Sequence, residues 1–314
     1  MTNKTKKIGL VLGSGAAKGW THIGIINALH EMGVKPDVIV GCSMGSLVGG
    51  ALAAGKFDEI SQWATSMDSW RIVKLLDWGV NRGGLVAGEK VFSHFQQMIG
   101  DLNIQDCDIP FATLATELYT GREHWLQSGR LVDAVRASCA MPGVLAPYLL
   151  DDHWLIDGAV VNPVPVSLCR AMGATHIIAV NVNSGIKKMR PDGKSPLEQV
   201  LQTQMAAEVD PEMKDRHTAF SNLLGSGKNW FANRTRKTQH DLSAPNVWGV
   251  VAGSIDIMQD RLTRARLAGE PPEVLIQPNL AHIGILEFNR AAELIEIGEK
   301  AVAPFKPILE SWIE

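Results

Sequence analysis

The sequence predicts an α/β fold of three layers, in which helices cover both faces of a mostly parallel central sheet. Short apolar runs alternate with helical patterns as far as residue 182, which is typical of parallel strands joined by crossover helices. A chain of 314 residues with 46% hydrophobic content can bury such a core. We expect residues 7–182 to form the main domain, residues 183–245 a polar and partly helical excursion, and residues 246–314 a C-terminal strand and helices that complete the domain.

The first strand–helix–strand unit is expected near the N-terminus. An apolar strand at residues 8–12 runs into residues 13–19, here called the glycine loop, and a helical pattern follows at about residues 20–32. Gly33 is placed to end this helix before a second strand at residues 37–40. The second strand leads directly into another glycine-containing segment.

The glycine loop also fits a loosened dinucleotide-binding pattern, because its glycines are spaced as Gly-x-Gly-x-x-x-Gly. Such a site expects an acidic residue at the end of the second strand, where this chain has Gly-Cys-Ser at residues 41–43. A Walker loop is excluded because Lys18 is neither preceded by glycine nor followed by serine or threonine. We therefore predict no nucleotide and no other cofactor. The successive N–H groups of Ser14, Gly15 and Ala16 suit an oxyanion instead.

The serine turn, Gly41-Cys42-Ser43-Met44-Gly45, lies between an apolar run at residues 38–40 and a run of small residues at 47–54. A strand, a Gly-x-Ser-x-Gly pentad and a helix are what a sharp turn with an exposed serine requires. Side chains at Gly41 and Gly45 would collide with the packed strand and helix. The N-terminus of the following helix favours an alkoxide on Ser43. We interpret Ser43 as a nucleophile, although the pentad alone also fits an ordinary strand-to-helix turn.

Beyond the serine turn the alternation of strands and helices continues. Residues 57–100 have a helical pattern with a break at 81–84, and residues 111–116 and 123–126 are predicted to pair around a turn. Further elements are expected at residues 131–139 (helix), 154–159 (strand), 175–182 (strand), 246–267 (amphipathic helix), 274–278 (strand) and 289–302 (helix).

Asp157 ends the apolar run at residues 154–156 and is followed by Gly158 and Ala159. A carboxylate in that position is costly to bury unless it has a partner or a chemical task. We interpret Asp157 as the general base. The alternative is that the Asp-Gly pair only forms a turn after a strand.

Three segments in this order carry a resemblance to a known family: the glycine loop, the serine turn and Asp157-Gly158-Ala159. On these motifs the chain resembles the patatin-like phospholipase family, in particular its bacterial branch related to neuropathy target esterase, over roughly residues 7–182. The resemblance implies a patatin-like fold and a lipid acyl hydrolase of phospholipase or lysophospholipase type. The chain departs from the family pattern at Ser14 and Ala16, where glycines are common, and at Ala159, where many members have a second glycine.

The same resemblance implies site roles, with Ser43 as nucleophile, Asp157 as its partner in a dyad, and no metal ion. The implied oxyanion hole consists of Ser14, Gly15, Ala16 and Lys18. A carboxylate with its ordinary pKa near ~4 is a weak base for a serine hydroxyl. Burial therefore has to raise the pKa of Asp157, or the geometry has to compensate.

Two other functions stay open at the level of sequence. An α/β-hydrolase with a Ser-Asp-His triad would use a late histidine, for which His282 is the first candidate and His240 the second. A weakly active, regulatory lipid-binding protein of the same fold is also compatible, because fold does not determine turnover.

The charge pattern bears on partners. A net charge of -3 gives no overall attraction to nucleic acid, which we exclude as a partner. Basic and aromatic residues are interspersed at residues 214–240, which suits peripheral membrane contact near the entrance to the site, or equally a solvated face that packs on the main domain. The sequence leaves the oligomeric state open.

The expected location is the cytoplasm, with the inner face of the membrane as the place of any peripheral contact. The basic tail and short apolar run at the N-terminus fit a solvated tail before a buried strand better than a signal peptide. The apolar runs are all shorter than the ~20 residues that span a bilayer. Neither a metal site nor a disulfide framework is indicated by the scattered Cys42, Cys107, Cys139 and Cys169.

Overall fold

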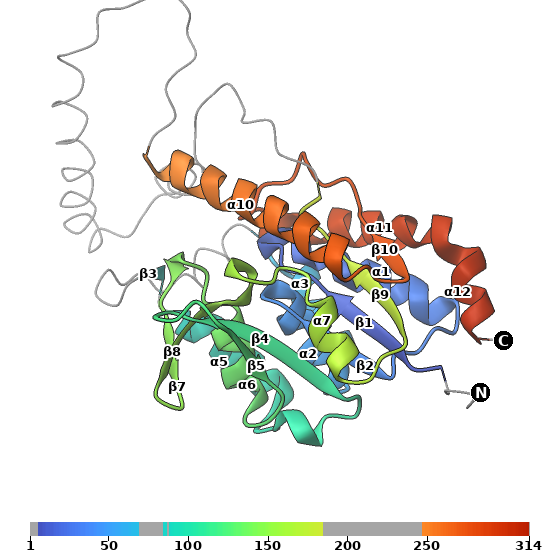
Figure 1. The fold of residues 1–314 in the computed structure, drawn as a ribbon, viewed down its shortest axis with the longest axis horizontal. Helices are drawn as coiled ribbons and strands as arrows, with labels where there is room; N and C mark the ends of the chain where they lie inside the picture. Colours follow the sequence, from blue (N-terminus) through green and yellow to red (C-terminus); the bar gives the residue numbers. More distant parts are fainter. Residues whose placement is uncertain (1–5, 69–83, 87, 185–246, 314) are drawn as a thin grey trace, which may run out of the picture. The chain divides into compact units, whose positions relative to one another are not determined.

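A computed structural model of the chain describes residues 6–68, 84–86, 88–184 and 247–313 (Figure 1). The chain divides into two compact units, Met1–Lys187 with Ile255–Glu314, and Lys188–Ser254. Of the second unit only residues 247–254 are described. The predicted membrane-contact segment at 214–240 and His240 lie outside the described residues, as does most of the predicted excursion at 183–245. The fold described below is that of the first unit.

An eight-stranded sheet forms the centre of this unit, in the order β10-β9-β1-β2-β4-β8-β7 with β5 paired to β4. Pairing is parallel from β10 through β4, and antiparallel between β4 and β5, β4 and β8, and β7 and β8. A separate parallel pair is formed by β3 (Gly84–Val86) and β6 (Gly143–Leu145). The strands of the main sheet are β1 (Ile8–Leu12), β2 (Val38–Gly41), β4 (Phe111–Glu117), β5 (Glu123–Leu126), β7 (Tyr148–Leu150), β8 (His153–Asp157), β9 (His176–Val180) and β10 (Val274–Ile276).

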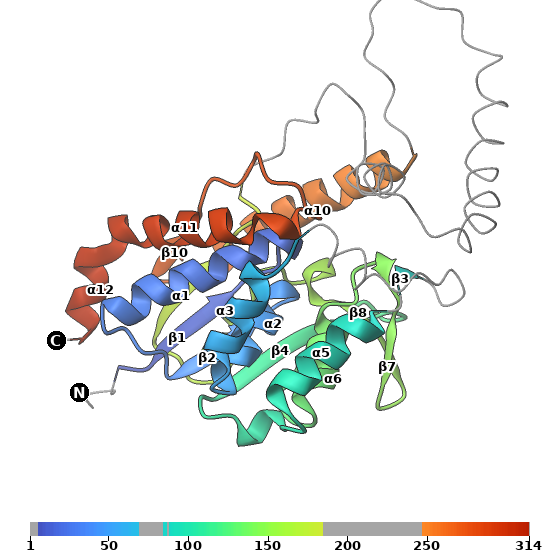
Figure 2. The same cartoon turned by 180° about the vertical axis from the view of Figure 1, so that it is seen from behind.

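Helices cover both faces of the sheet, so the predicted three-layer fold is confirmed. The larger core lies under α1, α2, α3, α5, α6 and α11, which Figure 2 shows on one face. The smaller core lies under α7 and the C-terminal part of α10, on the face turned to the viewer in Figure 1. The helices are α1 (Thr21–Glu31), α2 (Met44–Ala53), α3 (Phe57–Thr65), α5 (Glu89–Ile99), α6 (Leu131–Ser138), α7 (Val166–Ala171), α10 (Val247–Gly269), α11 (Ala291–Val302) and α12 (Lys306–Ile313). Short 3-10 helices are η1 (Ala16–Trp20), η3 (Ile104–Asp106), η4 (Gly158–Val160), η6 (Phe288–Arg290) and η7 (Ala303–Phe305).

Strands β1 and β2 consist only of apolar residues and glycine, because both of their faces are covered. In β1 the side chains of Leu10 and Leu12 enter the larger core, and Val11 between them enters the smaller one. Ile39 of β2 belongs to the larger core in the same way. Continuous apolar runs, rather than alternating ones, are what strands of a covered parallel sheet require.

Strand β4 determines where the functional residues meet. Thr113 pairs with both β2 and β5, and Ala115 pairs with both β5 and β8. Because a strand has only two edges, β2 and β8 must share one edge of β4, and β5 takes the other. Parallel β2 ends at Gly41 opposite Thr113, and antiparallel β8 ends at Asp157 opposite Ala115. The two strands therefore point their carboxyl ends at each other, and only Leu114 of β4 separates their last paired positions.

Several details differ from the sequence prediction. The glycine loop already turns into η1 at Ala16, so that irregular backbone is confined to residues 13–15. The short strands β3, β6 and β7 were not predicted, because three-residue strands carry too little periodicity to be recognised. The terminal helix α12 was not predicted either. Within the described part of the chain, no helix has both the length and the apolar character needed to cross a bilayer.

Candidate active site

Ser43 lies at the tip of the serine turn, between β2 and α2. Its backbone has φ 54° and ψ -123°, a conformation that costs energy for any residue with a side chain. Its N–H donates to the hydroxyl of Ser138 at 2.9 Å, which holds the turn from the side of α6. Ser43 is the N-cap residue of α2, so its side chain stands at the positive end of that helix. The sequence-predicted position of Ser43 is the one that the structure shows.

Glycine is required on both sides of Ser43 because backbone passes close to the turn. A Cβ atom on Gly41 would overlap the backbone of Gly45 and Ser46. A Cβ atom on Gly45 would overlap the carbonyl of Leu12 at the end of β1. The turn therefore packs against the start of α2 and the end of β1. Of Gly41, Ser43 and Gly45, only Ser43 carries a side chain.

Asp157 lies within hydrogen-bond distance of Ser43, as predicted. The Ser43 Oγ donates to Asp157 Oδ2 at 2.6 Å, and the N–H of Ala159 donates to Oδ1 at 2.8 Å. The Asp157 backbone is fixed as well, since its carbonyl accepts from the Thr116 hydroxyl at 2.9 Å and its N–H donates to the carbonyl of Ala140 at 2.9 Å. Each oxygen of the carboxylate thus has one defined partner.

Burial controls the acidity of this carboxyl group. Asp157 is 3% exposed and Ser43 is 9% exposed. Burial raises the pKa of Asp157 from its ordinary 3.8 to about 6, against the opposing effect of the hydrogen bonds from Ser43 and Ala159. The condition set by the sequence analysis, a base stronger than an ordinary aspartate, is met by the environment of the side chain.

The glycine loop lies beside the serine turn, because a Cβ on Gly45 would come within 2.7 Å of the Gly13 carbonyl oxygen and a Cβ on Gly19 would overlap Met44. Lys18 closes a turn through its N–H to the Gly15 carbonyl at 3.1 Å, and only 7% of this residue is exposed. The loop and the turn are therefore in direct contact.

Not every predicted donor of the glycine loop is available. The N–H of Ser14 donates to the carbonyl of Pro163 at 2.9 Å, so it is already used. Among the described residues, the N–H groups of Gly15 and Ala16 meet no acceptor. The predicted set of backbone donors therefore has to be corrected by the removal of the Ser14 N–H. Ala16 has φ 47°, the conformation for which the family pattern prefers glycine.

The structure does not bring the predicted triad histidine to the site. The His282 side chain is 51% exposed and its Nε2 lies 3.2 Å from Glu293 Oε1. Both carboxylate oxygens of Asp157 have partners that are not histidines. In the part of the chain that the structure describes, no cluster of three or more histidine, cysteine or acidic side chains is arranged to hold a metal ion.

Two serines of the site were missed by the sequence analysis. Ser138 holds the N–H of Ser43, and the Ser46 hydroxyl donates to the Ser43 carbonyl at 2.6 Å. Ser46 is readable in principle, because serine three residues after a helix N-cap commonly bonds backward in this way. Ser138 gives no such signal, since its position depends on where α6 ends in space.

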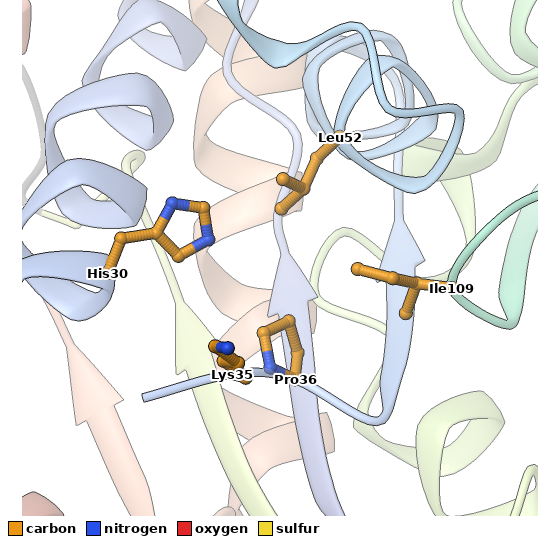
Figure 3. A pocket seen from close by; sticks show the side chains of 5 residues that line it. All are labelled: His30, Lys35, Pro36, Leu52 and Ile109. Carbon is orange, nitrogen blue, oxygen red and sulfur yellow. The ribbon is translucent and has the colours of Figure 1, made fainter. Parts of the chain in front are cut away.

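A pocket lies at the opposite end of β2 from Ser43. It has a volume of about 400 Å³ and is found before the start of β2, whereas Ser43 follows its end (Figure 3). Its lining consists of His30, Lys35, Pro36, Leu52 and Ile109.

Comparison with known sequences identifies the family. The profile of the patatin-like phospholipases matches residues 10–170 of the chain. The chain belongs to the patatin-like phospholipase family. Membership of this family implies a lipid acyl hydrolase, and it confirms the fold and the resemblance inferred from the three motifs.

Relatives of the chain include bacterial and animal proteins. An uncharacterized NTE family protein of Mycobacterium tuberculosis is 32% identical over 324 residues, which cover 94% of this chain and 90% of the relative. Neuropathy target esterase sws of Drosophila melanogaster is 33% identical over 184 residues, 56% of this chain and 13% of that protein. Human patatin-like phospholipase domain-containing protein 6 is also 33% identical, over 56% of this chain and 13% of its own length. The bacterial relative matches almost throughout, while the animal proteins share one segment.

Proposed function

We propose that this protein hydrolyses carboxylic esters of lipids, the acyl chains of phospholipids or lysophospholipids, with Ser43 as nucleophile and Asp157 as general base. The observation that carries the proposal is the 2.6 Å hydrogen bond between Ser43 Oγ and Asp157 Oδ2 in a buried site. A nucleophile and a base within this distance are the minimal equipment for acyl transfer. The lipid nature of the substrate rests on the family.

The first half of the reaction acylates Ser43. As Ser43 Oγ attacks the ester carbonyl carbon, its proton passes to Asp157 Oδ2, and the carbonyl oxygen becomes an oxyanion. The N–H groups of Gly15 and Ala16 donate to that oxyanion. When the intermediate collapses, the proton on Asp157 goes to the departing alcohol oxygen, and an acyl ester of Ser43 remains.

The second half releases the acid. Asp157 accepts a proton from a water molecule whose oxygen attacks the acyl carbon, and the same N–H groups bind the second oxyanion. Collapse returns the proton to Ser43 Oγ and frees the fatty acid. The carboxylate serves as base and then acid twice, which suits a pKa of about 6 better than an ordinary one.

The geometry favours this dyad over the alternatives. A triad would need a histidine between serine and carboxylate, but the two are already in direct contact and His282 is paired with Glu293 elsewhere. A regulatory protein without turnover has no need for the strained φ of 54° at Ser43. The cytoplasmic location and the membrane contact through residues 214–240 remain predictions.

The decisive experiment is labelling by a fluorophosphonate probe together with turnover of a medium-chain p-nitrophenyl ester and a lysophospholipid. We expect the wild type to be labelled and to hydrolyse both. Ser43→Ala should lose labelling and at least about 10³-fold in turnover. Ser311→Ala, at an exposed serine on α12, is the matched control and should behave as wild type.

Two results would contradict the proposal. Undiminished labelling of Ser43→Ala would move the nucleophile to another residue. A folded wild type that binds lipid but neither reacts with the probe nor cleaves either ester would show a lipid-binding protein rather than a hydrolase.

A further inference from the structure

The first two N–H groups of the glycine loop, those of Gly13 and Ser14, are hydrogen-bonded to neighbouring segments. The N–H of Gly13 donates to the Val180 carbonyl at 3.0 Å, and the N–H of Ser14 to Pro163 at 2.9 Å. The first N–H groups without an acceptor among the described residues are those of Gly15 and Ala16. What orients these two groups is therefore decided by the carbonyls that share their peptide planes.

A trans peptide is planar, and its C=O and N–H point in opposite directions. The N–H of Gly15 shares its plane with the carbonyl of Ser14, which accepts a hydrogen bond from Asn183 Nδ2 at 3.0 Å. The N–H of Ala16 shares its plane with the carbonyl of Gly15, which accepts from the N–H of Lys18 at 3.1 Å. The second tie is a local turn of η1. The first comes from a side chain 169 positions away in the sequence.

Asn183 is itself held in place. Its N–H donates to Asn181 Oδ1 at 3.1 Å, and the N–H of Asn181 donates to the Ile276 carbonyl at 3.0 Å. Since Ile276 ends β10, this connection runs from the loop to the edge of the sheet. The Asn183 side chain is half-buried, and its Nδ2 must be the end that faces Ser14, because a carbonyl only accepts.

We propose that Asn183 is a positioning residue of the ester hydrolysis proposed above, which orients the Gly15 N–H toward the oxyanion by holding the carbonyl of the same peptide. The inference rests on the proposed function for its catalytic consequence. Its structural part, that Asn183 determines the direction of the Gly15 N–H, stands by itself. Asn183 touches neither the substrate nor the reacting atoms and acts only through the peptide plane.

His22 holds the preceding peptide of the loop, through the carbonyl of Gly13, and has a less direct effect on the Gly15 N–H. Its Nε2 donates to the Gly13 carbonyl at 2.8 Å from a fully buried position on α1, and its Nδ1 has no partner among the described residues. Burial lowers the pKa of His22 to about 4, so the ring is neutral near pH 7 and keeps the proton on Nε2. The peptide that His22 orients carries the N–H of Ser14, one plane away from that of Gly15.

Asn183→Asp tests the proposal, because it keeps the shape of the side chain and removes the donor. The carboxylate would repel the Ser14 carbonyl, and the Gly15 peptide would turn. We expect kcat to fall by about 10- to 100-fold, part of the loss seen when an oxyanion donor is removed. KM should stay within about twofold, since the contact matters in the transition state. Asn183→Ala should lose less, because water can take the place of the amide.

Asn279→Asp is the matched control. Among the described residues, this exposed asparagine forms a hydrogen bond only through its oxygen, which accepts from the N–H of Ala281 at 3.4 Å, and aspartate keeps that contact. It adds the same charge to the protein and should leave kcat unchanged. His22→Gln, which retains a donor near Nε2, should lower kcat less than Asn183→Asp does.

An independent readout separates this inference from the proposed function. In protein labelled with ¹⁵N-glycine, Asn183→Asp should shift the Gly15 amide signal, and Asn279→Asp should leave it in place. An unmoved Gly15 signal overturns the proposal whether or not the wild type hydrolyses esters. So does a kcat of Asn183→Asp within twofold of a wild type whose turnover depends on Ser43, and so does a larger loss in His22→Gln. Absence of any Ser43-dependent turnover would refute the hydrolase, and the Gly15 signal alone would then decide the role of Asn183.

Discussion

The serine turn and the glycine loop begin alike and end differently. Each follows a parallel strand, and each leads into a helical segment. Each also contains one residue other than glycine with a positive φ, 54° at Ser43 and 47° at Ala16. In the serine turn the strained residue carries the proposed reacting group. In the glycine loop it carries only a methyl group.

The difference lies in what is left unpaired. In the serine turn the N–H groups of Cys42, Ser43 and Gly45 are bonded, to Leu12, Ser138 and Cys42 at 3.0, 2.9 and 2.9 Å, and only that of Met44 meets no acceptor among the described residues. In the glycine loop the N–H groups of Gly15 and Ala16 meet no acceptor within the described ranges. The turn therefore presents the Ser43 side chain beside one unpaired N–H group, and the loop presents backbone N–H groups only. Side-chain substitutions should therefore reduce activity strongly at the site around the serine turn and only slightly in the glycine loop.

The largest effect is expected for Asp157→Asn, which replaces the carboxylate that accepts the hydrogen bond from Ser43 Oγ. We expect kcat/KM to fall about 10³-fold or more, because the amide accepts no proton from Ser43. Stability should change in the other direction. The pKa of this carboxyl rises on folding from 3.8 to about 6, so the unfolded state ionises first and stability falls as pH rises between these values.

That rise corresponds to roughly 3 kcal/mol of unfolding free energy lost at neutral pH. Asp157→Asn should therefore unfold at higher denaturant concentration at pH 7, by up to about that amount, and should lose the decline in stability between about pH 4 and 6. Urea titrations at pH 4, 5, 6 and 7 measure this. A destabilised variant with wild-type turnover would make Asp157 a turn residue.

The pH profile of kcat/KM is the next test, with an intermediate effect. The base must be ionised, so activity should rise with pH with a midpoint near the pKa of about 6 and level off above about pH 7, with about one tenth of the plateau at pH 5. Circular dichroism at each pH distinguishes loss of activity from loss of fold. A midpoint near 4 would mean that the carboxyl is solvated in the working enzyme, in conflict with its burial.

The smallest effect is expected for Ser14→Ala, in the glycine loop. The Ser14 hydroxyl is buried and has no hydrogen-bond partner among the described residues, so its removal should raise stability by about 1 kcal/mol. Turnover should stay within about threefold. Ser46→Ala is the counterpart in the site of the serine turn, where the hydroxyl bonds the Ser43 carbonyl, and it should lower both stability and turnover. A tenfold loss in Ser14→Ala would show that the loop also presents a side chain.

Much of the fold could be predicted from local pattern alone. The buried strands β1, β2 and β9 are almost continuous apolar runs, and the antiparallel pairing of β4 with β5 followed from a turn between two predicted strands. The short β6 and β7 escaped prediction because each has three residues, and their pairing depends on partners distant in sequence. Local periodicity does not determine such pairs.

The site was predictable only in part, for a similar reason. Ser43 follows from the pentad, because a glycine on either side of a serine reports a steric requirement. The pairing with Asp157 was supplied by family resemblance, since no pattern shows that β2 and β8 share an edge of β4. The Ser14 donor was wrongly included, because the sequence does not show that Pro163 accepts its N–H.

The meeting of β2 and β8 on one edge of β4 also concerns how the enzyme becomes active during folding. The hydrogen bond from Ser43 to Asp157 joins residues 114 positions apart, and contacts of such separation form after the local ones because a long loop must close first. Asp157 lies at the end of β8, so detachment of the β7–β8 hairpin from β4 would remove the proposed base from Ser43. Recovery of ester turnover after dilution from denaturant should thus lag behind recovery of helical circular dichroism, and a partly folded chain would keep the proposed nucleophile without its base.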